Sequence, residues 1–420
     1  MHLLLFEDSR VEQLAPITMT RPAYAITCGG CTLLALLSKW NQASQTTNVV
    51  IRDFLAPLES ARRDNVRVNQ LPTGPTLAIN ARLTSSPAML SRLETLAKSE
   101  QCSVIMRNGI VLAKWFPNGI PGDSSSDTTY DELLESVIGG DVDHEEECSA
   151  GELVTLEFPH DIARLQLDYM TDNLAFLVKH GGHREVADGV FAADGVTIAE
   201  NVATDTRNGP IVLDEGATVR PFAFLRGPIV VGTGSRINEH SSIKDGVCIG
   251  HTVKVGGELE RSTVEPYSNK AHAGFLGFSY LGGWVNLGAG TSNSNLKNTY
   301  GTIRVTRNGQ KIDTGMQFLG CVIGDHAKSA INSSIFTGLT IGVASMLYGT
   351  IAANVPSFVN YAHSFGSVTG MTLESMVTTQ GRVYARRGLE QLECDTGMLR
   401  HVFEATQHER VGLEFAPPRF

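Results

Sequence analysis

The stretch of this 420-residue chain that is richest in groups able to do chemistry, residues 256–295, contains one histidine, His272. Histidine can take a proton near neutral pH from an attacking amine or hydroxyl, which makes His272 a candidate general base. The run Gly288-Ala289-Gly290 follows it, and backbone N–H groups without bulky side chains suit a pantetheine arm or an oxyanion. These groups point to acyl transfer, with a purely structural turn around His272 as the alternative.

Basic side chains able to pair with phosphates occur in and around the same stretch. Such pairs are charge-assisted, and an arginine can bind a phosphate through two parallel hydrogen bonds. We therefore expect a phosphorylated substrate near His272. The candidate cations are Arg220, Arg261, Lys270 and Lys297.

The element that must position these residues is a repeat with a period of six. Branched apolar residues recur at this spacing without a miss, which fits neither an amphipathic helix nor an alternating strand. Hexapeptide repeats are typical of a parallel β-helix with three hexads in each coil, and roughly twenty hexads predict about six or seven coils. The longest unbroken run consists of Leu213, Val219, Leu225, Val231, Ile237, Ile243, Ile249 and Val255.

The repeat lapses in two places. It fails for 25 residues after Val255, resumes at Leu281, and lapses again over residues 293–322. Loops on a rigid scaffold often carry function. We therefore expect both lapses to project from the coils as loops, and the first of them to hold the site.

Different patterns flank the repeat. Short apolar strands alternate with helical stretches over residues 1–160, which predicts an α/β domain with a parallel sheet. Residues 161–184 are expected to form a helical connector, residues 185–365 the β-helix, and residues 366–420 a helical tail. The acidic run Asp141–Glu147 predicts a solvated surface loop.

Composition argues against several classes of protein. A formal net charge of −10 and a pI of about 5.7 disfavour nucleic acid as a partner. No apolar run is long enough to span a membrane, and the apolar start lacks the basic leader of a signal peptide. The pair Cys28-Gly-Gly-Cys31 has no second pair or nearby histidines to complete a zinc site. We expect no metal there, and a cytoplasmic protein with reduced thiols.

The stretches Ser268-Asn-Lys-Ala-His-Ala-Gly-Phe-Leu-Gly277 and Val285-Asn-Leu-Gly-Ala-Gly-Thr291 resemble a family of bifunctional bacterial enzymes. These are the glucosamine-1-phosphate acetyltransferase/N-acetylglucosamine-1-phosphate uridylyltransferases, and the match is closer to a branch with a shortened N-terminal domain. The resemblance implies a left-handed β-helix that forms a homotrimer with sites between subunits. It also implies acetyl-CoA as the acyl donor.

The same resemblance assigns roles to individual residues. His272 would be the base, Asn286 would position the sugar, and Arg220 would bind the phosphate. Ala289 would lie against acetyl-CoA, and Gly288, Gly290 and Lys297 are grouped with it as cofactor-binding residues.

Two positions depart from the pattern of this family. Phe275 stands where the family has a substrate-binding tyrosine. Glu260 stands where it has a phosphate-binding lysine, and Arg261 beside it is the expected substitute. The implied acceptor is therefore an amino-sugar phosphate that need not be glucosamine 1-phosphate itself.

The N-terminal segments Leu4-Leu-Phe-Glu-Asp8, residues 16–22 and Asn80-Ala-Arg82 resemble sugar-phosphate nucleotidyltransferases of the short branch. The resemblance implies that Asp8, Arg21 and Asn80 bind a nucleoside triphosphate, with Mg²⁺ polarising the α-phosphate if the domain is active. The Gly-x-Gly loop of the wider family is missing, and Ala23 replaces its lysine. A domain that only binds a nucleotide or sugar, or only supports the assembly, is the alternative.

The sequence thus predicts acetyl transfer to an amino-sugar phosphate, together with sugar-1-phosphate nucleotidyl transfer by the N-terminal domain. The alternative is a sugar-nucleotide binding protein whose β-helix is a non-catalytic trimeric scaffold. A metal-dependent carbonic anhydrase on the same scaffold needs two histidines five residues apart on one coil edge. The histidines at 240, 251, 272 and 326 lack that spacing.

Overall fold

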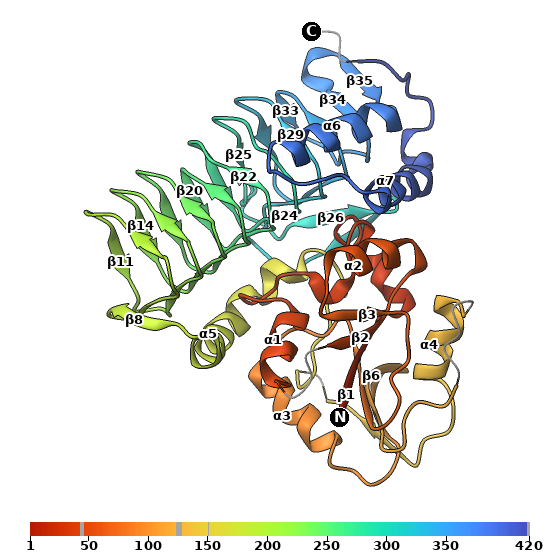
Figure 1. The fold of residues 1–420 in the computed structure, drawn as a ribbon. Coiled ribbons are helices and arrows are strands. Elements are labelled where there is room, and N and C mark those ends of the chain that lie inside the picture. The colour runs from red at the N-terminus through yellow and green to blue at the C-terminus, as the bar shows by residue number, and fades with distance from the viewer. Residues whose placement is uncertain (43–45, 123–127, 150, 418–420) are drawn as a thin grey trace. The chain divides into compact units, whose positions relative to one another are not determined.

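The computed structural model describes residues 1–42, 46–122, 128–149 and 151–417. The chain divides into two compact units (Figure 1). Unit 1 comprises residues 1–26 and 31–158, and unit 2 comprises residues 27–30 and 159–420. Within the described residues, no helix is both long enough and apolar enough to cross a membrane.

Unit 1 is built on a seven-stranded sheet in the order β3-β2-β1-β4-β6-β5-β7. The first four strands in this order are parallel, and β6 is antiparallel to both its neighbours. The expected strands are present, but the sheet is mixed rather than parallel. The strands are β1 (His2–Phe6), β2 (Thr47–Val50), β3 (Val66–Val68), β4 (Thr76–Asn80), β5 (Ser103–Arg107), β6 (Ile110–Phe116) and β7 (His144–Glu147).

The acidic run at 141–147 is only partly a loop. Its second half forms β7, which pairs in parallel with β5 at the edge of the sheet. The prediction of a loop was wrong there, because an edge strand can hydrogen-bond on one side and keep charged side chains in water.

Helices of unit 1 pack on the sheet through apolar residues such as Leu133 and Val137, which lie against Leu4 and Phe6. Between β1 and the first α-helix the chain forms three short 3₁₀ helices instead of a Gly-rich loop. The helices are η1 (Ser9–Leu14), η2 (Ile17–Met19), η3 (Ala23–Ala25), α1 (Leu33–Trp40), η4 (Asp53–Leu55), α2 (Ala56–Arg62), α3 (Pro87–Leu96) and α4 (Tyr130–Ile138).

Unit 2 contains a parallel β-helix, whose short strands stack coil upon coil (Figure 1). The strands form three faces, which we number in chain order within a coil. Face 1 contains β10 (Thr197–Ile198), β13 (Thr218–Val219), β16 (Arg236–Ile237), β19 (Lys254–Val255) and β22 (Asn269–Lys270). Face 2 contains β11 (Ala203–Asp205), β14 (Phe224–Arg226), β17 (Ser242–Lys244), β20 (Glu258–Glu260) and β23 (Phe275–Gly277). Face 3 contains β8 (Arg184–Ala187), β9 (Val190–Ala192), β12 (Ile211–Leu213), β15 (Ile229–Val231), β18 (Val247–Ile249), β21 (Thr263–Val264), β24 (Tyr280–Leu281), β28 (Cys321–Ile323) and β31 (Leu339–Ile341).

The C-terminal coils add further strands to unit 2. These are β25 (Ser292–Asn293), β29 (Lys328–Ser329), β30 (Ser334–Ile335), β32 (Met346–Leu347), β33 (Thr350–Ile351), β34 (Val359–Ala362) and β35 (Ser367–Gly370). The predicted parallel β-helix is confirmed. Its core is the period-six ladder, because all eight residues from Leu213 to Val255 are buried.

The first lapse in the period is not a projecting loop. After Val255 the chain continues as β20 to β24, each paired with the coil before it. The buried positions Leu259, Val264, Lys270 and Leu276 follow at intervals of four to six residues. The period fails because the turns change length, so the prediction of a loop was wrong for this segment.

The second lapse does leave the regular coil. It contains an antiparallel hairpin, β26 (Arg304–Arg307) with β27 (Gln310–Asp313), before the coil resumes at β28. This part of the prediction is confirmed.

Helices precede and follow the coils of unit 2. The helix expected from residue 161 is α5 (Asp161–Gly181), which ends at Gly182 in the left-handed region, with φ of 77°. Met170 and Leu174 of α5 pack on Val212 and Val230 of face 3. The expected helical tail consists of η5 (His363–Phe365), α6 (Leu373–Ala385), α7 (Glu393–Ala405) and η6 (Gln407–Arg410).

Candidate active site at a corner of the β-helix

A cavity of about 780 Å³ opens at the corner where face 1 turns into face 2. It contains both His272 and Arg220, which the sequence had singled out although they lie on different coils. The lining residues are Arg220, Pro221, Phe222, Arg236, Asn238, Glu239, His240, Gly256, Gly257, Ala271, His272 and Ala273.

The coil geometry explains why these residues meet. Arg220 and Asn238 are eighteen residues apart, which is one full coil, so they occupy the same corner on successive coils. Phe222 and His240 are related in the same way, and their rings stack with centroids 5.1 Å apart. Our sequence reasoning missed Phe222, Arg236, Asn238, Glu239 and His240. The eighteen-residue interval, applied to Arg220, would have located Asn238.

The backbone around His272 is held from two sides. The Nζ of Lys270 donates to the His272 carbonyl at 2.6 Å and to the Gly256 carbonyl at 3.2 Å. The Nδ2 of Asn238 donates to the Ala271 carbonyl at 2.8 Å, while its Oδ1 accepts from Arg236 Nε at 2.9 Å. The His272 side chain itself is exposed to solvent. The turn is therefore fixed and its imidazole is accessible.

Lys270, which we predicted to bind phosphate, is not among the residues that line this cavity. Its side chain takes an inward position in register with Val255 and is 1% exposed. Burial lowers the pKa of Lys270 to about 8. The lysine caps carbonyls inside the corner and supports His272 indirectly.

The charge of the cavity favours an anion. Arg220 is exposed, and neither Arg220 nor Arg236 forms an ion pair within the described residues. Glu239 is the single carboxylate in the lining. Two guanidinium groups that form no ion pair in the described part of the chain suit a phosphate, which accepts two parallel hydrogen bonds from one arginine.

Two other predicted substrate ligands lie outside this cavity. Arg261 is at the following corner, where its guanidinium carbon is 5.1 Å from the centre of the Phe278 ring. Phe275 is on face 2 in register with Glu258, and its ring covers Gly277, where a Cβ would approach within 2.3 Å of it. Neither residue is among those that line the cavity beside His272.

Asn286 and Lys297 are also placed elsewhere. Asn286 is exposed on the continuation of face 1, in register between Asn269 and Lys328. Lys297 precedes the β26–β27 hairpin, and its Nζ donates to the Thr302 carbonyl at 2.6 Å.

The run from Gly288 to Gly290 forms hydrogen bonds with the neighbouring coils and packs closely against them. The Gly288 N–H donates to Ser329 Oγ at 3.0 Å, and the Gly290 N–H donates to the Ala273 carbonyl at 3.0 Å. A Cβ at Gly288 would lie 2.6 Å from the backbone of Ala330. The two amides that we predicted to face an oxyanion are therefore already hydrogen-bonded within the coil. The carbonyl of Ala289 accepts from the Asn332 N–H.

In unit 1, two predicted nucleotide ligands meet at the carboxyl ends of β1 and β4. Asp8 accepts from Asn80 Nδ2 at 2.8 Å and, at 2.7 Å for each bond, from Arg82 Nε and Nη2. Arg82 is fully buried and also pairs with Glu157 at 3.0 Å. Burial would raise the pKa of Asp8, but the Arg82 hydrogen bonds and charge lower it on balance.

This edge of the sheet is where a ligand is expected. The chain leaves β1 toward β2 on one side and places β4 on the other, so the strand order reverses between β1 and β4. The polar atoms of Asp8 and Asn80 are nevertheless engaged within the unit, since Asn80 Nδ2 also donates to the Val111 carbonyl.

The third predicted ligand, Arg21, lies in a segment fixed by a second buried ion pair. Arg52 donates to both oxygens of Glu7 and to the carbonyls of Thr18 and Arg21. Within the described residues, no group of three or more His, Cys, Asp or Glu side chains is arranged to hold a metal. The carboxylates of Glu7 and Asp8 are both committed to arginines and do not fit the Mg²⁺ that a nucleotidyltransferase would use.

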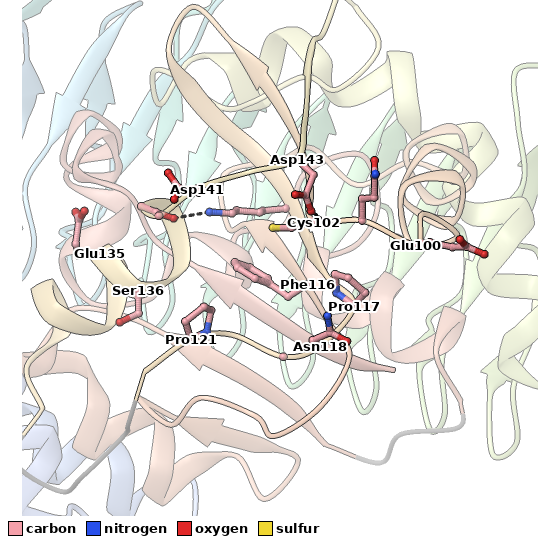
Figure 2. A pocket seen from close by; sticks show the side chains of 15 residues that line it. Glu100, Cys102, Phe116, Pro117, Asn118, Pro121, Glu135, Ser136, Asp141 and Asp143 are labelled. Carbon is pink, nitrogen blue, oxygen red and sulfur yellow. Dashed lines mark hydrogen bonds between the residues drawn. The ribbon is translucent and has the colours of Figure 1, made fainter.

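Unit 1 contains a cavity of its own, of about 410 Å³, which is shown in Figure 2. Its wall includes Cys102, Phe116 and Asp143, and the buried Lys114 donates to the Gly139 carbonyl at 2.5 Å. Phe116 pairs with Thr76, at the opposite end of β4 from Asn80. This cavity therefore lies at the other edge of the sheet from Asp8.

Comparison with known proteins finds similarity to transferases over part of the chain. Residues 3–180 match the sugar nucleotidyl transferase family. The bifunctional sugar-1-phosphate nucleotidylyltransferase/acetyltransferase of Sulfurisphaera tokodaii is 28% identical over 170 residues, which cover 39% of this chain and 42% of that protein. The bifunctional protein GlmU of Synechococcus elongatus is 30% identical over 165 residues, which cover 39% of this chain and 28% of that protein. The chain thus spans less than half the length of these relatives.

Solved structures with partial similarity include two acyltransferases. One is the acetyltransferase domain of PglB from Neisseria gonorrhoeae in complex with acetyl coenzyme A, at 12% identity and a TM-score of 0.16, covering 39% of this chain and 51% of that one. The other is the UDP-N-acetylglucosamine acyltransferase of Francisella novicida, at 10% identity and a TM-score of 0.22, covering 53% and 87%.

Proposed function

We propose, from the match of residues 3–180 to the sugar nucleotidyl transferase family and the distant homology to bifunctional acetyltransferases, that this chain modifies sugar phosphates. The principal reaction is acetyl transfer from acetyl-CoA to the amine of an amino-sugar phosphate at the corner cavity. The observation that carries the proposal is that His272 and Arg220 line one cavity. The resemblance assigns these two residues as base and phosphate ligand.

In the proposed reaction, Arg220 and Arg236 hold the phosphate and orient the sugar. His272 accepts a proton from the sugar amine as the amine nitrogen attacks the thioester carbonyl. The C–N bond forms, the C–S bond breaks, and the sulfur of coenzyme A leaves and takes up a proton. Asn238 and Lys270 hold the turn that carries His272.

We include a homotrimer in the proposal, with the cavity completed by a neighbouring copy. Two exposed apolar side chains lie in turns that follow strands of face 1 and of its continuation, several coils apart: Phe222 at 57% after β13 and Ile331 at 67% after β29. Their burial in an interface would be favourable. Asn286 and Phe275, which lie outside the cavity of their own chain, would contribute from the partner.

For unit 1, the family match supports sugar-1-phosphate nucleotidyl transfer as a second candidate activity. The Asp8–Arg82 and Glu7–Arg52 pairs favour the narrower version of this proposal, in which unit 1 binds a sugar nucleotide without transfer.

The test is release of free thiol from acetyl-CoA in the presence of amino-sugar phosphates. We expect the His272→Ala variant to lose about 10²- to 10⁴-fold in kcat, the usual contribution of a general base. The same mixtures, supplied with nucleoside triphosphates, are assayed for pyrophosphate release, which reports on unit 1.

A matched control is His251→Ala, which removes an exposed histidine from a different corner of the coil. We expect its rate to stay within about twofold of the wild type, because surface substitutions usually change little. Light scattering on both variants checks the oligomeric state. A folded trimer that releases no thiol with any acceptor would support the alternative of a non-catalytic scaffold instead.

A further inference from the structure

Cations on face 2 of the β-helix have carboxylate partners on the same surface. Lys244 Nζ lies 2.6 Å from Glu258 Oε1, and Arg226 forms a bidentate pair with Asp245. Each of these two cations is therefore neutralised by a neighbouring carboxylate. Face 1 differs, because Arg236 and Lys254 form no ion pair within the described residues.

The cations of face 1 are direct neighbours. Arg236 is in register with Lys254, and Lys254 is in register with Asn269. Adjacent strands of a sheet are about 4.8 Å apart, so these side chains emerge side by side. The outward row continues through Asn286 and Lys328 to Asn360 without a carboxylate.

The turn after α6 adds two more cations. Arg387 Nη2 donates to Asn269 Oδ1 at 3.1 Å, which holds its guanidinium beside the row position that follows Lys254. Arg386 precedes it and is exposed. A helix C-terminus favours a cation through its dipole, but that effect does not account for Arg236 or Lys254, which lie on the coils.

The electrostatic consequence is visible at Lys254. Its pKa is lowered by burial and then by the charges of Arg236, Arg387 and Arg386. The pKa of Arg387 is lowered by burial and by Arg386. Four like charges held together destabilise one another unless an anion joins them.

We propose that Arg236, Lys254 and Arg387 form a binding site for the diphosphate group of a ligand that occupies the His272 cavity. Arg236 also lines that cavity, so the two sites are continuous. A diphosphate carries enough charge and acceptor oxygens to bridge several cations. The source is either coenzyme A or a sugar nucleotide, and naming coenzyme A rests on the proposed function.

The experiment is calorimetric titration of the full chain with inorganic pyrophosphate, coenzyme A and UDP-N-acetylglucosamine. We expect Lys254→Met and Arg387→Met each to weaken pyrophosphate binding about tenfold, the order expected for one charge-assisted contact. The affinity should also fall as salt is added. The nucleotide whose affinity falls in parallel with that of pyrophosphate identifies the source.

The matched control is Lys311→Met, which removes the same charge from the exposed β26–β27 hairpin and should bind pyrophosphate like the wild type. His272→Ala should keep pyrophosphate affinity even if it abolishes transfer, so failure of the proposed reaction is separable from failure of this site. The inference is overturned if the wild type does not bind pyrophosphate at millimolar concentration. It is equally overturned if folded Lys254→Met and Arg387→Met bind within twofold of the wild type.

Discussion

The carboxyl edge of the unit 1 sheet and the corner cavity of the β-helix are both rich in polar groups, but they differ in how these groups are partnered. At the edge of the sheet, Arg82 is fully buried and bound by Asp8 and Glu157. In the corner cavity, Arg220 is exposed and has no ion pair within the described residues.

This difference distinguishes an arginine that stabilises the fold from an arginine that is available to bind a ligand. A buried charge must be compensated inside the protein, and once compensated it has little left to offer a ligand. A guanidinium without an internal partner stays hydrated until an anion replaces the water. We therefore assign chemistry to the corner cavity first, although the family match covers the N-terminal part of the chain.

The largest expected effect comes from an arginine-to-methionine exchange in each region. Arg82→Met leaves the Asp8 carboxylate without its buried partner, which should destabilise unit 1 by about 3–5 kcal/mol. Arg220→Met removes an exposed charge and should change stability by less than about 0.5 kcal/mol. Thermal unfolding followed by circular dichroism compares the two.

For acetyl transfer we expect the opposite ranking, with the larger effect in Arg220→Met than in Arg82→Met. Arg220→Met should raise the KM for the sugar phosphate, whereas Arg82→Met should leave acetyl transfer intact at temperatures where the chain is folded. Equal melting temperatures for the two variants would contradict the distinction between an internally paired and an available arginine.

The second prediction concerns how each region holds its buried cation. Arg82 has two carboxylate partners, while the described hydrogen bonds of the Lys270 ammonium go to the carbonyls of Gly256 and His272. Burial lowers the pKa of Lys270 from 10.5 to about 8. Between these values the unfolded chain keeps a proton that the folded chain has released, so stability from this group rises with pH across that window.

The measurement is the difference in unfolding free energy between the wild type and Lys270→Met at pH 7.5 and at pH 10. We expect this difference to shift in favour of the wild type by up to about 3 kcal/mol, the equivalent of the pKa change. Lys328 and the other lysines titrate in both proteins and cancel. A pH-independent difference would show that Lys270 is already hydrated inside the corner.

The fold was largely predictable because one branched residue in six leaves few alternatives. The ladder from Leu213 to Val255 gave the β-helix directly, and its inward positions are all buried. The coil from Gly256 to Leu281 was missed as a coil because its turns shorten by one or two residues, which destroys the period while the stacking continues. A strict period of six requires turns of constant length, so a coil can continue where the period is lost.

The site was less predictable, since residue type does not tell inward from outward positions. Lys270 stands beside His272 in sequence and looked like a ligand, but its place in the coil points it into the core. Gly288 and Gly290 looked like an oxyanion hole, but they are needed where coils approach closely. His240 and Asn238 were overlooked because their relation to Arg220 and Phe222 is one full coil rather than one hexad.

The smallest expected effect tests whether the corner cavity depends on a fixed turn. Asn238→Ala removes both the donor to the Ala271 carbonyl and the acceptor for Arg236. Asn238→Asp removes only the donor. A lost hydrogen bond is worth about 1 kcal/mol, so we expect kcat for acetyl transfer to fall about fivefold in both variants if the donor positions His272. The KM for the sugar phosphate should rise in both variants. Arg236 loses its acceptor in Asn238→Ala, and in Asn238→Asp the new carboxylate pairs with Arg236 and competes with the phosphate. If Asn238→Asp kept the wild-type kcat, the turn would be held by Lys270 alone, and the rigidity that we attribute to Asn238 would belong to the coil itself.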